Sequence, residues 1–355
     1  MNRKLTRRAA LTATAAALAT RVAGAAAPAA GSRGLGLVIH SFPVRTATDR
    51  DRTPGERFGE PFRFLEHARS LGAAGIQVGL GPMADARAEA LRARAEAASL
   101  WVEGIASLPK SDAETPRFEA ELRAARLAGA AVVRTVCLSG RRYETFDTLE
   151  AFRRFGDESA RALDRAARVA VKQGVILAVE NHKDWRADEL AALLKKVGRE
   201  GLGVCLDTGN SMALLEDPAE VVEALAPWTV TTHFKDMGVE PYRDGFRLSE
   251  VPLGDGVLDL PRMVKTLRAA RPGLRFNLEM ITRDPLDVPC LGGRYWATFP
   301  DLPARDLARA LAFVRDHPPA RPLPRVSPLS PADRLRAEDE NVARCLAFAR
   351  DRLGL

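Results

Sequence analysis

The stretch Thr229-Val-Thr-Thr-His-Phe-Lys-Asp236 decides how the rest of this 355-residue chain is interpreted. Its β-branched and aromatic residues are typical of a buried strand, and polar side chains follow where that strand would end. Three other apolar runs end in the same way, each on a carboxylate: 175–180 at Glu180, 202–207 at Asp207 and 274–279 at Glu279. Together with His233 from the first stretch, these residues predict a site built at one end of a sheet.

Strand-like and helix-like segments alternate along the chain. Four more short apolar runs precede those above, at 35–40, 75–80, 101–106 and 130–138, and helical segments separate the eight runs. Runs that are apolar throughout are typical of parallel strands covered on both faces. Eight strand–helix units close most simply into a (β/α)8 TIM barrel, an α/β fold. A doubly wound open sheet is the alternative, but no G-x-G-x-x-G sequence follows the first run.

The composition of the chain divides it into three parts. Residues 1–30 are predicted to be an export signal and linker, and residues 31–317 the TIM-barrel catalytic domain. Residues 318–355 begin with a Pro-rich connector and continue into a helix. Its start, Ser330-Pro331, combines an N-cap with proline at the first helical position. We expect this C-terminal helix to pack on the barrel rather than to form a second domain.

The paired arginines Arg7 and Arg8 precede an Ala-, Leu- and Thr-rich run and then small residues near Ala25. This arrangement resembles a twin-arginine (Tat) export signal, although Ala10 replaces the usual large apolar residue. A Sec signal or a retained anchor is the alternative. We expect an exported, periplasmic protein that does not associate with the membrane once the signal is removed, since no later stretch holds about 18 uninterrupted apolar residues.

Charge and cysteine content exclude several classes of protein. The net charge is +7, but residues 1–27 contain five basic residues and no acidic one, which leaves +2 for the remainder. A nearly neutral chain gives no electrostatic support for nucleic-acid binding. The four cysteines are far apart and form no C-x-x-C pair, so neither a disulfide framework nor a zinc knuckle is indicated.

In a TIM barrel the catalytic groups lie at the carboxyl ends of the strands. Glu180, Asp207, His233 and Glu279 end the fifth to eighth strands, so they can meet near the barrel axis. Three carboxylates that close repel one another and need a counter-charge, which a divalent cation supplies. Three oxygens and one imidazole nitrogen suit one Mn²⁺, Mg²⁺, Co²⁺ or Zn²⁺ ion. The alternative is that each residue is an independent hydrogen-bonding or salt-bridge partner at its strand end.

Four short motifs in this order resemble the xylose isomerase-like TIM-barrel superfamily, in particular its sugar phosphate isomerase/epimerase branch. They are Ala178-Val-Glu-Asn-His182, Leu206-Asp-Thr-Gly-Asn210, His233-Phe-Lys-Asp236 and Leu278-Glu279, and Pro252-Leu-Gly-Asp-Gly256 also resembles that branch. The resemblance implies that Glu180, Asp207, His233 and Glu279 are the metal ligands. It also implies that Glu180 and Glu279 are the acid/base pair that takes a proton from one face of the substrate and returns it on the other.

His182, Asn210 and Lys235 follow three of the expected ligands by two or three residues, and His40 ends the first strand. We expect these four residues to bind substrate oxygens or to orient ligands, with ordinary loop hydrogen bonding as the alternative. The chain departs from the ketohexose epimerases of the superfamily at Thr208-Gly-Asn210, where a histidine is usual. It departs again at Lys235-Asp236, where an arginine that binds substrate is common. These differences argue against a free ketohexose as the substrate.

The sequence therefore predicts a divalent-metal-dependent isomerase or epimerase that moves a proton through a metal-held enediolate. Its small-molecule carbohydrate substrate would be a keto sugar, a polyol-derived ketone or a sugar acid. The alternatives are a lyase or dehydratase acting on a 3-keto sugar or glycoside, and a non-catalytic sugar-binding protein. An apurinic endonuclease is excluded because its multi-zinc centre needs more histidines than the five present. Barrels of this kind often pair, so a homo-oligomer remains open.

Overall fold

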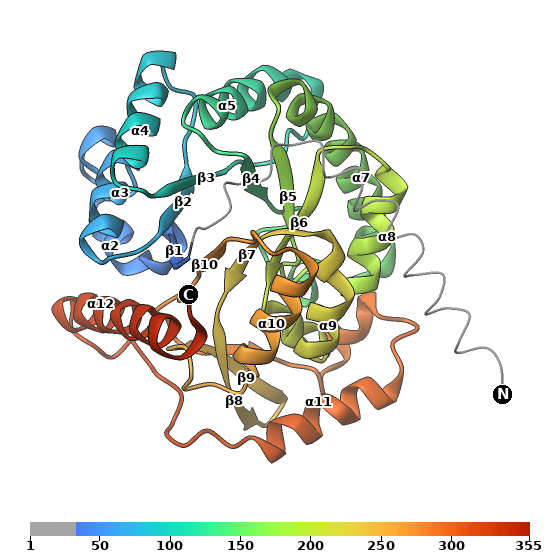
Figure 1. Cartoon of the computed structure of the whole chain (residues 1–355). Helices are drawn as coiled ribbons and strands as arrows, with labels where there is room; N and C mark the ends of the chain where they lie inside the picture. Colours follow the sequence, from blue (N-terminus) through green and yellow to red (C-terminus); the bar gives the residue numbers. More distant parts are fainter. Residues whose placement is uncertain (1–32) are drawn as a thin grey trace.

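In the computed structural model, which describes residues 33–355, eight parallel strands close into a barrel (Figure 1). Their order around the barrel is β1-β10-β7-β6-β5-β4-β3-β2. The (β/α)8 fold predicted from the sequence is confirmed, whereas the predicted export signal lies outside the described residues. The barrel strands are β1 (Leu35–Val38), β2 (Gly75–Gly79), β3 (Trp101–Ile105), β4 (Val132–Thr135), β5 (Ile176–Glu180), β6 (Leu202–Asp207), β7 (Thr229–Phe234) and β10 (Phe276–Leu278).

Helices cover the outside of the barrel (Figure 1), and none of those in the described part of the chain is long and apolar enough to cross a membrane. Two short helices lie in loops, α2 (Pro43–Thr48) and α6 (Arg142–Thr145). The outer helices are α3 (Pro61–Ser70), α4 (Asp85–Ala97), α5 (Thr115–Leu127), α7 (Leu149–Gln173), α8 (Ala187–Val197), α9 (Pro218–Leu225), α10 (Leu260–Ala270) and α11 (Ala304–Asp316).

Helix α7 shows how the local sequence sets the position of a strand. It begins after Thr148, whose side chain accepts a hydrogen bond from the Ala151 amide at 3.1 Å. It ends at Gly174, where φ of +67° reverses the chain in a conformation that glycine adopts without strain. Strand β5 starts two residues later at Ile176, and its five residues are all buried. This short connection places Glu180 at the carboxyl end of the barrel.

A layer of polar side chains lies inside the barrel beneath that end. Glu103 Oε2 accepts hydrogen bonds from Gln77 Nε2 at 3.1 Å, Thr231 Oγ1 at 2.7 Å and Asn277 Nδ2 at 3.0 Å. Burial raises the pKa of Glu103, against the opposing effect of Arg275. Because every residue of this layer comes from a different strand, the network fixes the strands relative to one another.

The seventh strand is followed by an antiparallel sheet that the sequence pattern did not predict. It consists of β8 (Asp236–Tyr242), β9 (Gly245–Val251) and β11 (Leu286–Val288). The carboxylate of Asp236 accepts hydrogen bonds from the backbone amides of Gly254 at 2.9 Å and Gly256 at 3.0 Å, which closes the loop after β9. A Cβ at Gly256 would lie 2.2 Å from Asp236 Oδ1, so the loop requires glycine there. The hairpin thereby brings β9 over the carboxyl end of the barrel.

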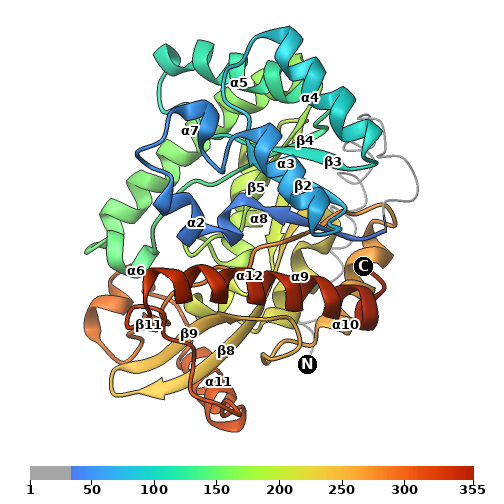
Figure 2. The same ribbon diagram turned by 90° about the vertical axis from the view of Figure 1, so that its left-hand side faces the viewer.

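The C-terminal helix α12 (Pro331–Phe348) lies across the side of the barrel near α2 (Figure 2). Its buried residues Val342 and Cys345 belong to the main hydrophobic core. Glu338 accepts hydrogen bonds from the backbone amides of Val44 at 2.7 Å and Arg45 at 3.1 Å, and so satisfies the free amides at the start of α2. The helix is therefore attached to the barrel by both apolar packing and hydrogen bonds.

Candidate metal centre

The four residues predicted as metal ligands lie together at the carboxyl end of the barrel. Glu180, Asp207 and His233 are in β5, β6 and β7, and Glu279 follows β10 directly. Each contributes one oxygen or nitrogen atom to a cluster in which all the atoms lie within 4.8 Å of one another. All four side chains are buried, with Glu279 the most accessible at 4 %. The barrel therefore brings together groups that are up to 99 positions apart in the sequence.

The hydrogen bond that His233 makes inside the barrel decides which of its nitrogens faces the cluster. His233 Nε2 lies 2.6 Å from Gln77 Oε1, while Gln77 Nε2 donates to Glu103. Since the Gln77 oxygen is an acceptor, Nε2 carries a proton. Burial would lower the pKa of His233, but Cys205, Glu279 and Glu180 raise it well above its ordinary value, so without an ion Nδ1 is protonated as well. Nδ1 lies 3.1 Å from oxygens of both Glu180 and Glu279 but forms no hydrogen bond within the described structure. A divalent cation bound among these three groups would take the place of the Nδ1 proton and leave the ring neutral, as a metal ligand must be.

Asp207 has a second buried atom that forms no hydrogen bond among the described residues. Its Oδ1 accepts hydrogen bonds from the backbone amides of Gly209 at 2.9 Å and Asn210 at 2.8 Å. Its Oδ2 is buried and lies 2.8 Å from Lys235 Nζ, but the two are not aligned for a hydrogen bond. Burial raises the pKa of Asp207 to about 6. Three carboxylates and one imidazole are a donor set that fits a divalent cation.

Two basic side chains supply part of the counter-charge that the sequence argument assigned to an ion alone. Arg134 in β4 donates from Nε to Glu180 Oε2 at 2.7 Å and from Nη2 to the same oxygen. Lys235 Nζ lies 2.8 Å from Asp207 Oδ2 and 2.6 Å from Glu279 Oε2.

The basic side chains around Glu180 and Glu279 also keep these two glutamates ionised. Burial would raise the pKa of Glu180, but Arg134 and His233 hold it well below its ordinary value. Burial would likewise raise the pKa of Glu279, yet His233 and Lys235 lower it in the same way. Both carboxylates are therefore ionised, as ligands of a cation must be.

A cavity of about 420 Å³ opens beside the cluster. Of the predicted residues, His40, His182 and Glu279 line its wall. His40 Nδ1 lies 3.1 Å from Glu279 Oε1, and His182 Nδ1 is buried without a hydrogen bond among the described residues. The remaining cavity wall comes from Arg134, Val136, Ser139, Gly140, Arg141, Glu144, Lys183, Ile281, Arg283 and Leu286.

The other two predicted pocket residues, Asn210 and Lys235, lie against the cluster and not in the cavity wall as the structure describes it. Asn210 Nδ2 donates to Glu180 Oε1 at 2.9 Å, and its Oδ1 accepts from Lys183 Nζ. Lys235 Nζ contacts the carboxylates of Asp207 and Glu279. In this geometry Asn210 and Lys235 orient the cluster, whereas His40 and His182 can contact a molecule in the cavity.

Four charged residues of the site were missed by the sequence argument. Arg134 interrupts the apolar run 130–138, and Lys183 follows His182, so both gave a local signal. Glu250 in β9 and Arg283 before β11 gave none, because their positions depend on the hairpin. Arg283 binds both oxygens of Glu250, from Nε at 3.0 Å and from Nη2 at 2.5 Å, and Glu250 Oε1 lies 3.8 Å from Lys235 Nζ.

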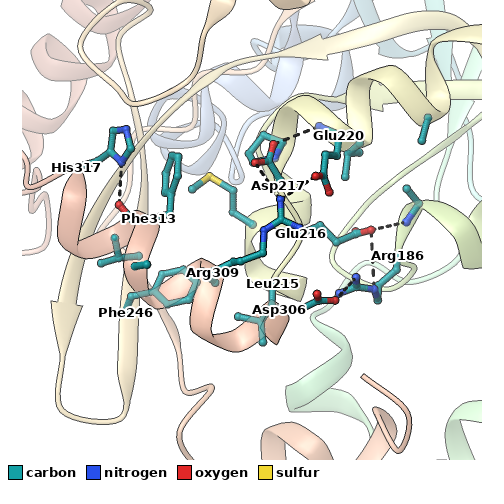
Figure 3. Close-up of a pocket in the computed structure, with 18 of the residues that line it drawn as sticks. Arg186, Leu215, Glu216, Asp217, Glu220, Phe246, Asp306, Arg309, Phe313 and His317 are labelled. Atoms are coloured by element: carbon teal, nitrogen blue, oxygen red, sulfur yellow. Dashed lines mark hydrogen bonds and ion pairs between the residues drawn. The ribbon is translucent and has the colours of Figure 1, made fainter. Parts of the chain in front are cut away.

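A separate cavity of about 510 Å³ lies between α11 and the start of α9 (Figure 3). Its charged groups pair with one another, since Arg186 Nη2 lies 3.1 Å from Asp306 Oδ2 and Arg309 Nη2 lies 2.7 Å from Glu220 Oε1. None of the predicted site residues lines it. The smaller cavity beside the cluster is therefore the candidate active site.

Comparison with known proteins agrees with this geometry. The sequence model of the Xylose isomerase-like TIM barrel family matches residues 65–316. The chain belongs to this family. The match includes all four residues of the cluster and ends one residue before the 317 boundary predicted for the barrel. The fold and the family resemblance expected from the sequence are thus confirmed.

Relatives of this xylose isomerase-like barrel include 3-oxo-isoapionate decarboxylase of Pectobacterium atrosepticum, which is 34 % identical over 94 residues. That match covers 26 % of the chain and 34 % of the relative, so the chain matches about a third of the relative's length. The solved structure of L-ribulose 3-epimerase has a TM-score of 0.53 at 18 % identity, covering 87 % of the chain and 98 % of that protein. The probable 3-DHS dehydratase AsbF of Bacillus anthracis has a TM-score of 0.51 at 16 % identity, covering 69 % and 91 %. At these identities the structures show a shared fold.

Proposed function

We propose that the chain is a divalent-metal-dependent enzyme that isomerises or epimerises a keto sugar or a related polyol ketone. The observation that supports this most directly is the four-residue cluster, in which His233 Nδ1 faces two carboxylates, next to a cavity whose wall includes Glu279. Glu180, Asp207, His233 and Glu279 would hold one Mn²⁺, Mg²⁺, Co²⁺ or Zn²⁺ ion. Such an ion would polarise a keto oxygen as a Lewis acid and make the neighbouring C–H bond more acidic.

Glu279 is the carboxylate best placed to move the proton, because it lines the cavity. It takes the proton from the carbon beside the keto group. The C–H electron pair then forms the C=C bond of an enediolate, and the carbonyl π pair moves to oxygen. Return of the proton to the opposite face of the same carbon gives an epimer. Return of the proton to the former carbonyl carbon, while the hydroxyl proton of the first carbon passes to the former carbonyl oxygen, gives an isomer.

The predicted role of Glu180 as the second proton carrier rests on the family resemblance. In the structure, Arg134 and Asn210 donate hydrogen bonds to its two oxygens, and it is fully buried. These contacts favour a ligand that is held in place. If Glu180 acts only as a ligand, proton transfer by Glu279 on one face favours an isomerase over an epimerase.

A lyase is the second candidate function. The relative that shares 34 % identity over 94 residues is a decarboxylase, and AsbF, which shares the fold, is a probable dehydratase. The same enediolate or enolate chemistry expels a β-hydroxyl group, and a β-keto acid loses CO₂ to give an enolate that only needs one proton donor. Because one fold can host several reactions, the isomerase and the lyase are distinguished by identifying the reaction products.

The reaction is tested by incubating the metal-loaded protein with keto sugars, 3-keto-glycosides and keto sugar acids in D₂O. Deuterium at the carbon beside the keto group, with an epimer or isomer as product, supports the proposed isomerase. Release of CO₂ or of a β-substituent assigns the lyase instead. Absence of both deuterium incorporation and product, from a protein with full metal content, would leave sugar binding without catalysis.

Metal content should depend on the cluster. We expect about one divalent ion per purified chain, lost in both His233→Ala and Asp207→Asn, because the first removes a ligand and the second removes the negative charge of another. Inductively coupled plasma mass spectrometry measures the ion, and circular dichroism shows whether the variants are folded. Metal retained in both folded variants would mean that the cluster is a salt-bridge network and not a metal centre.

The affinity for the metal ion should also depend on the orientation of the His233 ring. Gln77→Met removes the oxygen that accepts the His233 Nε2 proton at 2.6 Å. We expect metal affinity to fall by about 10- to 100-fold, because the ring and its tautomer are no longer fixed. Competition with a chelating dye measures the affinity. The matched control is Gln173→Met, since the Gln173 amide lies outside the cluster and donates to Glu119 at 3.2 Å. Equal affinity in Gln77→Met and the control would show that Gln77 does not orient the ligand.

A further inference from the structure

The wall of the candidate active site carries an excess of positive charge. Four basic side chains line it, Arg134, Arg141, Lys183 and Arg283, against the two acids Glu144 and Glu279. Three of the four already have a carboxylate partner. Arg134 pairs with Glu180, Arg141 Nε lies 2.6 Å from Glu144 Oε2, and Arg283 binds Glu250.

Lys183 is the exception. Its side chain is buried, with 3 % of the residue exposed, and its Nζ donates to the amide oxygen of Asn210. It forms no ion pair with a carboxylate in the part of the chain that the structure describes. Burial lowers the pKa of Lys183 to about 8. The positive charges of Lys235 and Arg283 act in the same direction, and the carboxylates of Glu250 and Asp207, which form no ion pair with it, oppose them. A buried ammonium group has three donors and is costly unless an anion faces it.

The balance of charge around the cluster also favours an anionic substrate. Around the cluster and the hairpin above it, four acids are matched in number by four basic side chains. A divalent cation would add two positive charges, and an anionic substrate would offset part of them. The acids are Glu180, Asp207, Glu250 and Glu279, and the basic residues are Arg134, Lys183, Lys235 and Arg283.

We propose that the substrate is a keto sugar acid whose carboxylate binds Lys183. This inference rests on the proposed function, because it places the substrate in the same cavity and names its class. Lys183 and Glu279 line one cavity, so a carboxylate at Lys183 leaves the rest of the carbon chain free to reach Glu279. One unpaired cation matches the single charge of a carboxylate better than the double charge of a phosphate group.

Binding of non-reactive probes to the metal-loaded full chain tests this proposal. Isothermal titration calorimetry would compare D-gluconate, neutral D-glucitol and D-glucitol 6-phosphate. In the wild type we expect D-gluconate to bind at least about 10-fold more tightly than D-glucitol. In Lys183→Met we expect its affinity to fall by about 10- to 100-fold, with D-glucitol unchanged, because a charged hydrogen bond is lost. Lys183→Arg should restore part of the preference, and exposed Lys265→Met is the matched control.

Equal binding of acid and neutral probe by the wild type would overturn the proposal even if Lys183→Met does not fold. Equal losses for both probes in a folded Lys183→Met would overturn it too, since the lysine would then be structural. Tighter binding of the phosphate than of D-gluconate, lost in Lys183→Met, would assign a sugar phosphate instead. Metal content measured on the same samples separates this result from the proposed function: a carboxylate preference without a bound ion would contradict the metalloenzyme and support the subsite.

Discussion

Glu279→Gln is expected to lower kcat by about 10²- to 10⁴-fold, the usual contribution of a positioned acid/base group. The substitution keeps the size of the side chain and can still accept a hydrogen bond from His40, which lies 3.1 Å from Oε1. It removes the carboxylate that opens into the cavity and would take the proton. The measurement is the rate of deuterium incorporation into whichever keto compound the screen in D₂O identifies.

Metal content must be determined on the same Glu279→Gln sample, because Glu279 is also an expected ligand. Saturating the variant with Mn²⁺ should restore the ion but not the rate. The matched control is Glu89→Gln on the exposed face of α4, which should leave kcat unchanged. If the metal-saturated variant kept the wild-type rate, Glu279 would have no part in proton transfer, and the other residues of the cavity wall would have to supply the base.

Lys235→Met is expected to lower the free energy of unfolding by about 3–5 kcal/mol, the usual cost of removing one partner from a buried ionic group. Lys235 is 1 % exposed and lies within 2.8 Å of both Asp207 and Glu279, with Glu250 at 3.8 Å. Without the ammonium group these carboxylates lose an opposite charge in a buried site. Urea denaturation of the metal-free protein, followed by circular dichroism, measures the change.

The control for Lys235→Met is Lys265→Met, an exposed lysine of α10 for which we expect a change within about 0.5 kcal/mol. Adding Mn²⁺ should return part of the lost stability to Lys235→Met, because an ion in the cluster replaces a missing positive charge. A loss no larger than that of the control would show that Lys235 does not balance the cluster.

The sequence by itself determined the barrel and the cluster. Strand β6 has the predicted bounds, and the other barrel strands lie within the predicted runs, because an apolar run that ends on a polar residue is a local pattern. The four cluster residues could be found for the same reason: each is at the end of its own strand, and a closed barrel brings all strand ends to one side. Once the fold was inferred, no side-chain geometry was needed to place them together.

Only the tertiary structure decided the electrostatics of the site. Arg134 binds Glu180 across 46 positions, and Glu250 reaches Lys235 and Arg283 only because the hairpin of β8 and β9 folds over the barrel. Arg134, Arg141 and Arg283 are scattered along the sequence, yet the fold brings all three to the cavity wall beside Lys183. These ion pairs depend on which loops come into contact once the barrel has folded. A local sequence pattern does not predict such contacts. The strands fix where a reaction can occur, whereas the charges assembled around them determine which substrate the cavity can accept.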